Sequence, residues 1–246
     1  MKPIDAWSRL IVREARGSMS QFIAKKCRTR LGPGSAGRLM TPEEFDSAPE
    51  WAWKKGYRYE LIRDVLVVSP FLEAAIRDCN DHMGYWLRHY RDSDPRGSAL
   101  DATLPEHIVY TNNRRWADRV VWTGLGRIPN PETEQPSIVI EFVSFRRRDA
   151  LRDWEQKRDE YLAAGVKEYW IIDRFRRIMT VYRKGLAGPT SDVVMEAQSY
   201  QTGLLPGFVL PLSQLLARAD SWSRAKRARR QPEDTPKIPP AGGIDG

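Results

Sequence analysis

The sequence predicts a single mixed α/β domain, of the α+β kind, in which helices flank a central mixed β-sheet. The expected elements follow the order α-β-β-α-β-β-β-α-β-β, which suits helices packed on one sheet. Residues 137–143 form a nearly continuous apolar run, which is typical of a strand buried on both faces. Residues 149–164 carry apolar side chains at helical spacing and are followed by Gly165, a residue that suits the position after a helix.

The first expected element is a short helix, because Thr41-Pro42-Glu43-Glu44 supplies an N-cap, an N1 proline and an acidic first turn. Strands at 57–62 and 65–69 are expected to form a hairpin around Arg63-Asp64. Apolar residues at helical spacing then predict a helix over 72–90. The remaining strands are expected at 102–110, 115–122, 137–143, 168–172 and 178–182. The segments 204–208 and 212–216 are expected to pack across one edge of the sheet.

The basic residues concentrate in the two terminal segments. The chain of 246 residues carries a net charge of +8. Residues 1–40 contain nine Lys or Arg against two acidic residues, residues 218–246 contain seven against four, and the part between them is slightly acidic. We therefore expect a folded domain at 41–217 between a flexible extension at 1–40 and a disordered tail at 218–246. These arms either add non-specific affinity for phosphates or are simply solvated.

The sequence carries no signal for export or membrane insertion. No apolar run approaches the roughly 18 residues that a spanning helix needs, and the first thirty residues lack a signal-peptide pattern. Cys27 and Cys79 form neither a metal-ligand spacing nor a disulfide framework. No P-loop, dinucleotide-binding fingerprint, nucleophile-elbow serine or zinc signature is present. We expect a cytoplasmic protein that does not contact membranes.

Two carboxylates lie within runs that otherwise indicate buried strands. Strand periodicity places Glu141 on the same face as Val139, and Asp118 on the same face as Val120. An unpaired buried charge costs several kcal/mol, so each carboxylate must be ion-paired, protonated or bound to a cation. Two inward carboxylates on successive strands suit a divalent ion such as Mg²⁺. A structural salt bridge to an arginine is the alternative for each residue.

A lysine and several arginines lie near these carboxylates in the predicted fold. Lys157 falls on the inward stripe of its helix, where it could hold a phosphate oxygen or orient a water molecule. The alternative is a surface lysine paired with Asp153. Glu60, by its pattern, is an ordinary strand residue paired with an arginine. The arginines that could contact DNA phosphates, or could equally belong to an exposed loop, are Arg146, Arg147, Arg148 and Arg152.

Several of these segments resemble the Uma-two family of bacterial restriction-endonuclease-like proteins. Residues 59–70, YELIRDVLVVSP, resemble the family's opening motif. Ala117-Asp118 resembles its Pro-Asp, and residues 141–144 resemble its E-x-hydrophobic-Ser. The most specific similarity is residues 153–173, which match D-x3-K, a tyrosine and the GVxEYWxxD block. The resemblance covers about residues 41–185, in the order of the family.

The resemblance implies a restriction-endonuclease-like core of the PD-(D/E)XK nuclease superfamily, with Mg²⁺ or Mn²⁺ as cofactor and DNA as substrate. It implies Asp118 and Glu141 as metal ligands, Glu60 as a further acidic active-site residue, and Lys157 as the catalytic lysine, moved from the strand to the helix. Val143 stands where the superfamily has its lysine, so activity depends on Lys157. Ala117 replaces the usual proline, which changes the entry of the strand more than the chemistry. Many such nucleases dimerise, so a homodimer is a possible assembly.

Two alternatives from other functional classes stay open. A non-cutting DNA-binding module would keep the fold and bind DNA in a salt-sensitive way, without cleavage in Mn²⁺. A structural or interaction protein would use the acidic residues for internal salt bridges. In that case divalent metal should not raise the melting temperature, whereas a ligand that binds the native state should.

Overall fold

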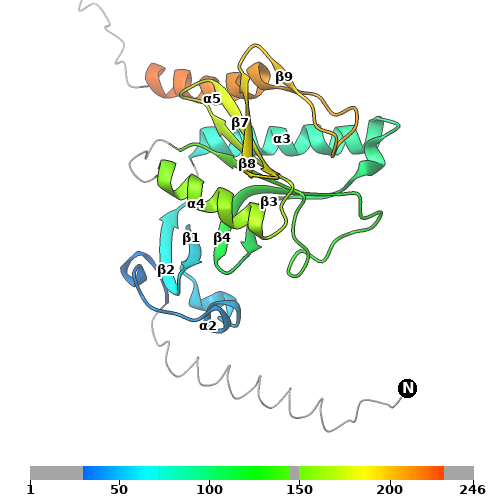
Figure 1. Ribbon diagram of the computed structural model, residues 1–246. Helices are drawn as coiled ribbons and strands as arrows, with labels where there is room; N and C mark the ends of the chain where they lie inside the picture. Colours follow the sequence, from blue (N-terminus) through cyan, green and yellow to red (C-terminus); the bar gives the residue numbers. More distant parts are fainter. Residues whose placement is uncertain (1–29, 72, 145–149, 230–246) are drawn as a thin grey trace, which may run out of the picture.

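The structure is a computed structural model that describes residues 30–71, 73–144 and 150–229. Its centre is one eight-stranded sheet with the order β2-β1-β4-β5-β6-β7-β8, in which β3 also pairs with β4 (Figure 1). The strands of this sheet are β1 Tyr57–Ile62, β2 Val65–Pro70, β3 Leu100–Tyr110, β4 Arg114–Thr123, β5 Ile138–Phe142, β6 Glu168–Asp173, β7 Ile178–Gly185 and β8 Gly188–Met195. A second sheet joins β9 Ser199–Tyr200 to β10 Leu210–Pro211.

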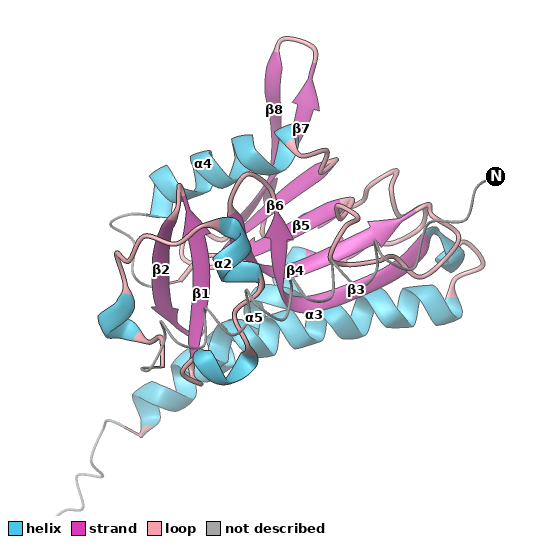
Figure 2. Ribbon diagram, turned by 90° about the horizontal axis from the view of Figure 1, so that it is seen from below, coloured by secondary structure: helices cyan, strands magenta, loops and turns pink. Residues whose placement is uncertain are grey.

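The helices cover both faces of the sheet, so the predicted mixed sheet with flanking helices is confirmed. They are α2 Pro42–Asp46, α3 Ala74–Ser93, α4 Ala150–Ala163 and α5 Leu212–Ala228, with 3-10 turns at Pro33–Ser35, Glu50–Ala52 and Gly97–Ala99. Figure 2 shows α4 on one side of the sheet and α3 with α5 on the other. None of the helices in the described ranges is long and apolar enough to cross a membrane.

The parallel pair β5–β6 is connected by α4, while β4–β5 and β6–β7 are antiparallel. A crossover helix is the usual link between parallel strands, because the chain must return to the same end of the sheet. The apolar run at 137–143 therefore forms a strand buried on both faces, as predicted. Val139 belongs to the buried cluster that contains Tyr161 of α4, and Ile140 belongs to the cluster that contains Met83 of α3.

Residues 31–40 differ from the expectation of a flexible extension. Leu31 and Met40 are buried in a small core with Phe45, Tyr59 and Leu66. The backbone of Leu31 donates to Ala52 O and accepts from Lys54 N, at 2.7 and 2.8 Å. This segment contributes to the fold because its two apolar side chains cover the β1–β2 hairpin. Residues 1–29 of the expected extension lie outside the described residues.

The C-terminal part also differs from the expectation. The segment 212–216 begins α5, a helix that continues to Ala228 and packs on α3 rather than across a sheet edge. Leu212, Leu215 and Leu216 are buried in the core on that face. Strand β8 was not predicted, because most of its side chains are exposed and no apolar alternation marks it. The folded unit is thus longer than the expected range 41–217.

Gly84 allows a close approach between α3 and the sheet. A Cβ atom at this position would lie 2.6 Å from Nη2 of Arg119, whose guanidinium is buried and hydrogen-bonded. We expect Gly84→Ala to lower the free energy of unfolding by about 1–3 kcal/mol through overpacking, although alanine favours a helix by about 1 kcal/mol. Urea unfolding measures the change. Gly34→Ala is the control, because a Cβ atom at that position would meet no heavy atom within 4 Å; equal stability of the two variants would contradict the prediction.

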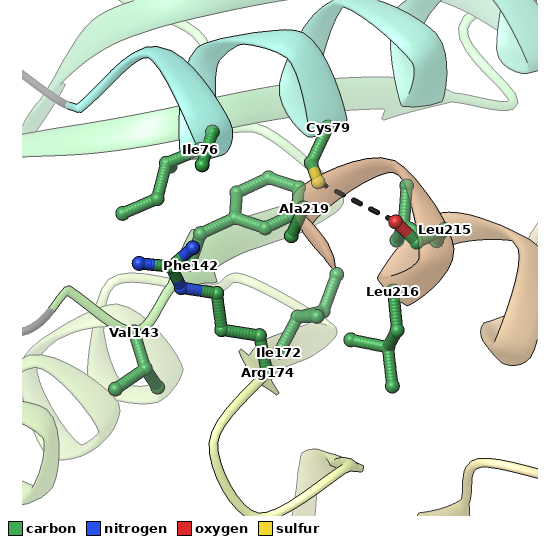
Figure 3. Close-up of a pocket in the computed structure, with 10 residues that line it drawn as sticks. Ile76, Cys79, Phe142, Val143, Ile172, Arg174, Leu215, Leu216 and Ala219 are labelled. Carbon is green, nitrogen blue, oxygen red and sulfur yellow. Dashed lines mark hydrogen bonds between the residues drawn. The ribbon is translucent and has the colours of Figure 1, made fainter. Parts of the chain in front are cut away.

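Cys79 lies in a small apolar cavity of about 10 Å³ between α3 and α5, and its Sγ donates to Leu215 O at 3.4 Å (Figure 3). Burial raises the pKa of this thiol to about 11. Since only the thiolate is nucleophilic, we expect Cys79 in a Cys27→Ser variant to resist Ellman's reagent at pH 8 until urea unfolds the protein. Rapid labelling of the folded protein would show that the α3–α5 contact opens readily.

Candidate active site

The candidate site lies where β4 and β5 separate. The paired register between these strands ends at Arg119 and Ile140, one residue before Asp118 and Glu141. Beyond that point a side chain takes the place of the backbone acceptor, because Oδ2 of Asp118 accepts the hydrogen bond from Phe142 N at 2.7 Å. This bond fixes the Asp118 carboxylate between the two strands. The predicted inward positions of Asp118 and Glu141 are confirmed, since their exposed fractions are 1% and 7%.

The other oxygen of Asp118 faces an arginine. Nη1 of Arg58 lies 2.9 Å from Oδ1 of Asp118, and Nη2 of Arg58 lies 3.5 Å from Oε1 of Glu106. The Arg58–Asp118 contact lacks hydrogen-bond geometry, so Oδ1 is a buried oxygen without a hydrogen-bond donor among the described residues. The guanidinium also lies over the ring of Trp116, 5.6 Å from its centroid. Asp118 therefore keeps one carboxylate oxygen that is paired only by charge.

Lys157 connects the helix to both carboxylate strands. Its exposed fraction is 6%, and its Nζ donates to Oε1 of Glu141 and to the carbonyl of Trp116, both at 2.9 Å. Oε1 of Glu60 lies 3.6 Å from the same Nζ and accepts from Trp116 N at 2.9 Å. The structure thus brings Glu60, Asp118, Glu141 and Lys157 together. Lys157 is not a surface lysine, and among the described residues Glu60 faces this lysine rather than the arginine that its pattern alone suggested.

The electrostatics of the site centre on Glu141. The pKa of its carboxyl is raised to about 8, mainly by burial; Lys157 opposes this rise and the neighbouring Asp118 adds to it. A carboxyl with this pKa holds a proton over much of the neutral range when no metal ion is bound. The site therefore carries less negative charge than its acidic residues suggest.

This raised pKa predicts how stability depends on pH. The folded state keeps the Glu141 proton up to about pH 8, whereas the unfolded chain releases it near the ordinary value of 4.5. Proton binding therefore favours the folded state, so the stability that it contributes is fully present below about pH 4.5 and is lost as the pH rises to about 8. Urea titrations in EDTA should show wild type losing stability relative to Glu141→Gln across this range. A constant difference between the two proteins would contradict the assignment.

The donor set fits a hard divalent cation. Oδ1 of Asp118 lacks a hydrogen-bond donor among the described residues, and the carboxylate of Glu141 could supply a second oxygen to a cation at the strand gap. The described residues contain no group of three His, Cys, Asp or Glu side chains that could hold a metal ion together. Mg²⁺ commonly takes one or two carboxylates and fills its remaining positions with water and phosphate oxygens. Asp118 and Glu141 are thus sufficient for Mg²⁺ or Mn²⁺ only when water and substrate complete the shell.

The arginines expected to contact phosphates mostly lie outside the described residues. Arg146, Arg147 and Arg148 belong to the segment 145–149, which the structure does not describe. Arg152 lies in the first turn of α4, but the position of its side chain is not described. These four residues stay a prediction.

Sequence reasoning missed the residues that support the site. Asn80 of α3 donates from Nδ2 to the carbonyl of Asp118 at 2.6 Å and accepts from Nε of Arg119 at 2.7 Å. Nη2 of Arg119 also donates to Asn80 O at 2.7 Å. Arg58 and Arg115 are likewise buried, and Arg115 forms a bidentate pair with Glu160 of α4. The only signal in the sequence was the presence of arginines among the apolar residues of these strands.

Three comparisons with known proteins bear on the chain. The model of the Uma2 family, described as "Putative restriction endonuclease", matches residues 42–213. A crystal structure of "a putative nuclease belonging to DUF820" from Anabaena variabilis ATCC 29413 is similar with a TM-score of 0.60 and 15% sequence identity. The similarity covers 73% of this chain and 99% of that chain, and at this identity it shows the fold alone. None of the curated proteins matches the chain.

Proposed function

This chain belongs to the Uma2 family, and from that membership we propose that it is a metal-dependent endonuclease that hydrolyses phosphodiester bonds of DNA. The observation that carries the proposal is the buried cluster of Asp118, Glu141 and Lys157 at the gap between β4 and β5. Buried ionisable groups gathered at one point, with a strongly raised carboxyl pKa, are typical of functional sites.

Asp118 and Glu141 would hold Mg²⁺ or Mn²⁺. When bound, such an ion polarises a phosphate and lowers the pKa of a coordinated water molecule. The Nζ atom of Lys157, fixed by two hydrogen bonds, is placed to offset the negative charge that develops on the phosphate and to orient the attacking water. Glu60 keeps Lys157 and the backbone of Trp116 in position. Arg146, Arg147, Arg148 and Arg152 would contact flanking phosphates.

The test is cleavage of supercoiled plasmid with Mg²⁺, with Mn²⁺ and with EDTA. We expect the wild type to nick the plasmid only with metal, and Glu141→Ala to abolish nicking. The matched control is Glu155→Ala, which removes an exposed glutamate from the same helix that carries Lys157. Cleavage that survives Glu141→Ala would contradict this site. DNA binding by the wild type without cleavage would instead support the non-cutting binding module.

One observation favours the structural alternative and gives it a test. Both carboxylates already have a cationic partner, Arg58 for Asp118 and Lys157 for Glu141. If these pairs serve only the fold, Mg²⁺ and Mn²⁺ should leave the melting temperature unchanged. If Asp118 and Glu141 bind metal, Mg²⁺ or Mn²⁺ should raise the melting temperature, because binding to the native state stabilises that state. Asp118→Asn should then remove this increase.

A further inference from the structure

An aromatic pocket lies beside the candidate active site. Its volume is about 580 Å³, within the range of about 300–1,000 Å³ that is usual for ligand sites. The pocket is lined by residues between Phe45 in α2 and Tyr59 in β1, by Phe71, and by residues near the ends of β3 and β4 that face each other. The aromatic side chains that give it its character are Trp53, Tyr57, Phe71, Tyr110 and Trp116. Phe71 is 43% exposed, so part of this aromatic surface faces solvent.

Basic side chains alternate with these rings. Nζ of Lys54 lies 5.9 Å from the ring centroid of Tyr57, and the guanidinium of Arg114 lies 5.1 Å from that of Tyr110. Lys55 adds a further exposed positive charge to the lining. Asp46 and Glu50 also line the pocket, and Arg114, which lies beside the lining residue Tyr110, pairs with Asp46 at 2.6 Å. Rings for stacking, interleaved with cations that follow a phosphate backbone, are typical of sites for unpaired nucleic acid.

Trp116 belongs both to the pocket and to the candidate active site. Its ring lines the pocket, while its backbone N–H donates to Glu60 and its carbonyl accepts from Lys157. The cation over this ring is Arg58, which also pairs with Asp118. The indole Nε1 is buried without a hydrogen-bond partner among the described residues. Trp116 therefore links the pocket directly to Glu60 and Lys157 of the candidate active site.

We propose that this pocket receives an unpaired nucleobase adjacent to the phosphodiester that is cut, so that the preferred substrate is DNA with unpaired nucleotides rather than intact duplex. The inference rests on the proposed nuclease function and names its substrate class. In a duplex both faces of each base are covered by stacking, so a base must leave the stack before a protein ring can contact its face. The cations around the rings favour a base that is still attached to its phosphates over a neutral apolar ligand.

The test measures binding without catalysis. Fluorescence anisotropy of the full chain in EDTA compares an intact duplex, the same duplex with a central bubble of unpaired thymines, and the single strand. Stacking of one base contributes about 1–3 kcal/mol, so we expect the bubble to bind about 5- to 150-fold more tightly than the duplex. Phe71→Ala and Tyr57→Ala should each reduce this ratio. Tyr85→Ala, which removes an exposed aromatic ring from α3 outside the pocket, should leave it unchanged.

A second readout reports stacking directly. A 2-aminopurine in the bubble should lose fluorescence when wild type binds and should keep it when Phe71→Ala binds. Equal affinity for bubble and duplex, or a preference that persists in both pocket variants, would overturn the proposal and leave the pocket to another occupant, such as a peptide segment. If the wild type still nicks plasmid in that case, the nuclease function stands. A chain that neither cuts nor binds any of these DNAs would overturn both.

Discussion

Replacing Lys157 by methionine is expected to reduce metal-dependent DNA cleavage by about 100- to 1000-fold, the usual loss when one preorganised electrostatic group is removed from an active site. Methionine keeps most of the length and volume of lysine and removes its charge. The variant therefore leaves the α4–sheet contact filled while the phosphate loses the cation that offsets its developing charge. Lys167→Met is the matched control, because Lys167 is exposed.

The pH profile separates this role from a purely structural one. Lys157 lowers the pKa of Glu141, so its loss should raise the pH at which the Glu141 carboxylate forms. Any residual cleavage by Lys157→Met should thus need a higher pH than cleavage by wild type. Cleavage at the wild-type rate and with the wild-type pH profile would show that the lysine from the helix does not take part in the reaction.

Replacing Glu168 by alanine is expected to lower the free energy of unfolding by about 3–5 kcal/mol, as is usual when one partner of a buried ion pair is removed. Glu168 is 5% exposed and accepts four hydrogen bonds from side chains. The donors are Trp170 Nε1, Arg183 Nε, Tyr200 OH and Thr202 Oγ1, at 2.9, 2.9, 3.0 and 2.9 Å. Without the carboxylate Trp170, Tyr200 and Thr202 lose an acceptor in the interior, and Arg183, whose side chain is 32% exposed, loses its buried partner.

Urea unfolding measures this loss as a shift of the midpoint at an unchanged slope. Glu168→Gln should have a smaller effect, because an amide oxygen still accepts hydrogen bonds. Glu155→Ala, at an exposed position of α4, is expected to change stability far less. If Glu168→Ala is as stable as Glu155→Ala, the network adds no net stability.

Glu168 also explains the most specific part of the family resemblance. It lies in the block 165–173, whose last residue, Asp173, accepts hydrogen bonds from the backbone of Phe175 and Arg176. The contacts of Glu168 join β6 to β7 and to the segment that contains Thr202. The match of this block to the family motif therefore reflects residues that hold the sheet together. The residues proposed for metal binding, Asp118 and Glu141, lie earlier in the chain.

The local sequence pattern was sufficient to predict the main helices and strands and the burial of the candidate site residues. The apolar alternation around Asp118 and Glu141 correctly placed both carboxylates inside the fold, and the helical stripe correctly placed Lys157 against the sheet. These inferences succeeded because side-chain direction repeats with a period of two in strands and about 3.6 in helices. A charge within an apolar stripe is visible without any knowledge of the fold.

The sequence by itself thus determined the fold class, the positions of most strands along the chain and the two buried carboxylates with their lysine. Only the tertiary structure decided which groups these residues meet. Arg58, which pairs with the Asp118 carboxylate, lies in β1. Asn80, which donates a hydrogen bond to the Asp118 carbonyl, lies in α3. Both are far from β4 in the chain. Periodicity reports which face of an element is buried, but not which distant side chain is packed against it, because that depends on how strands are ordered in the sheet. Leu31 was missed because the residues that it packs with lie elsewhere in the sequence. The edge strand β8 pairs with its neighbour β7, but it was missed because most of its side chains are exposed and form no repeating apolar face.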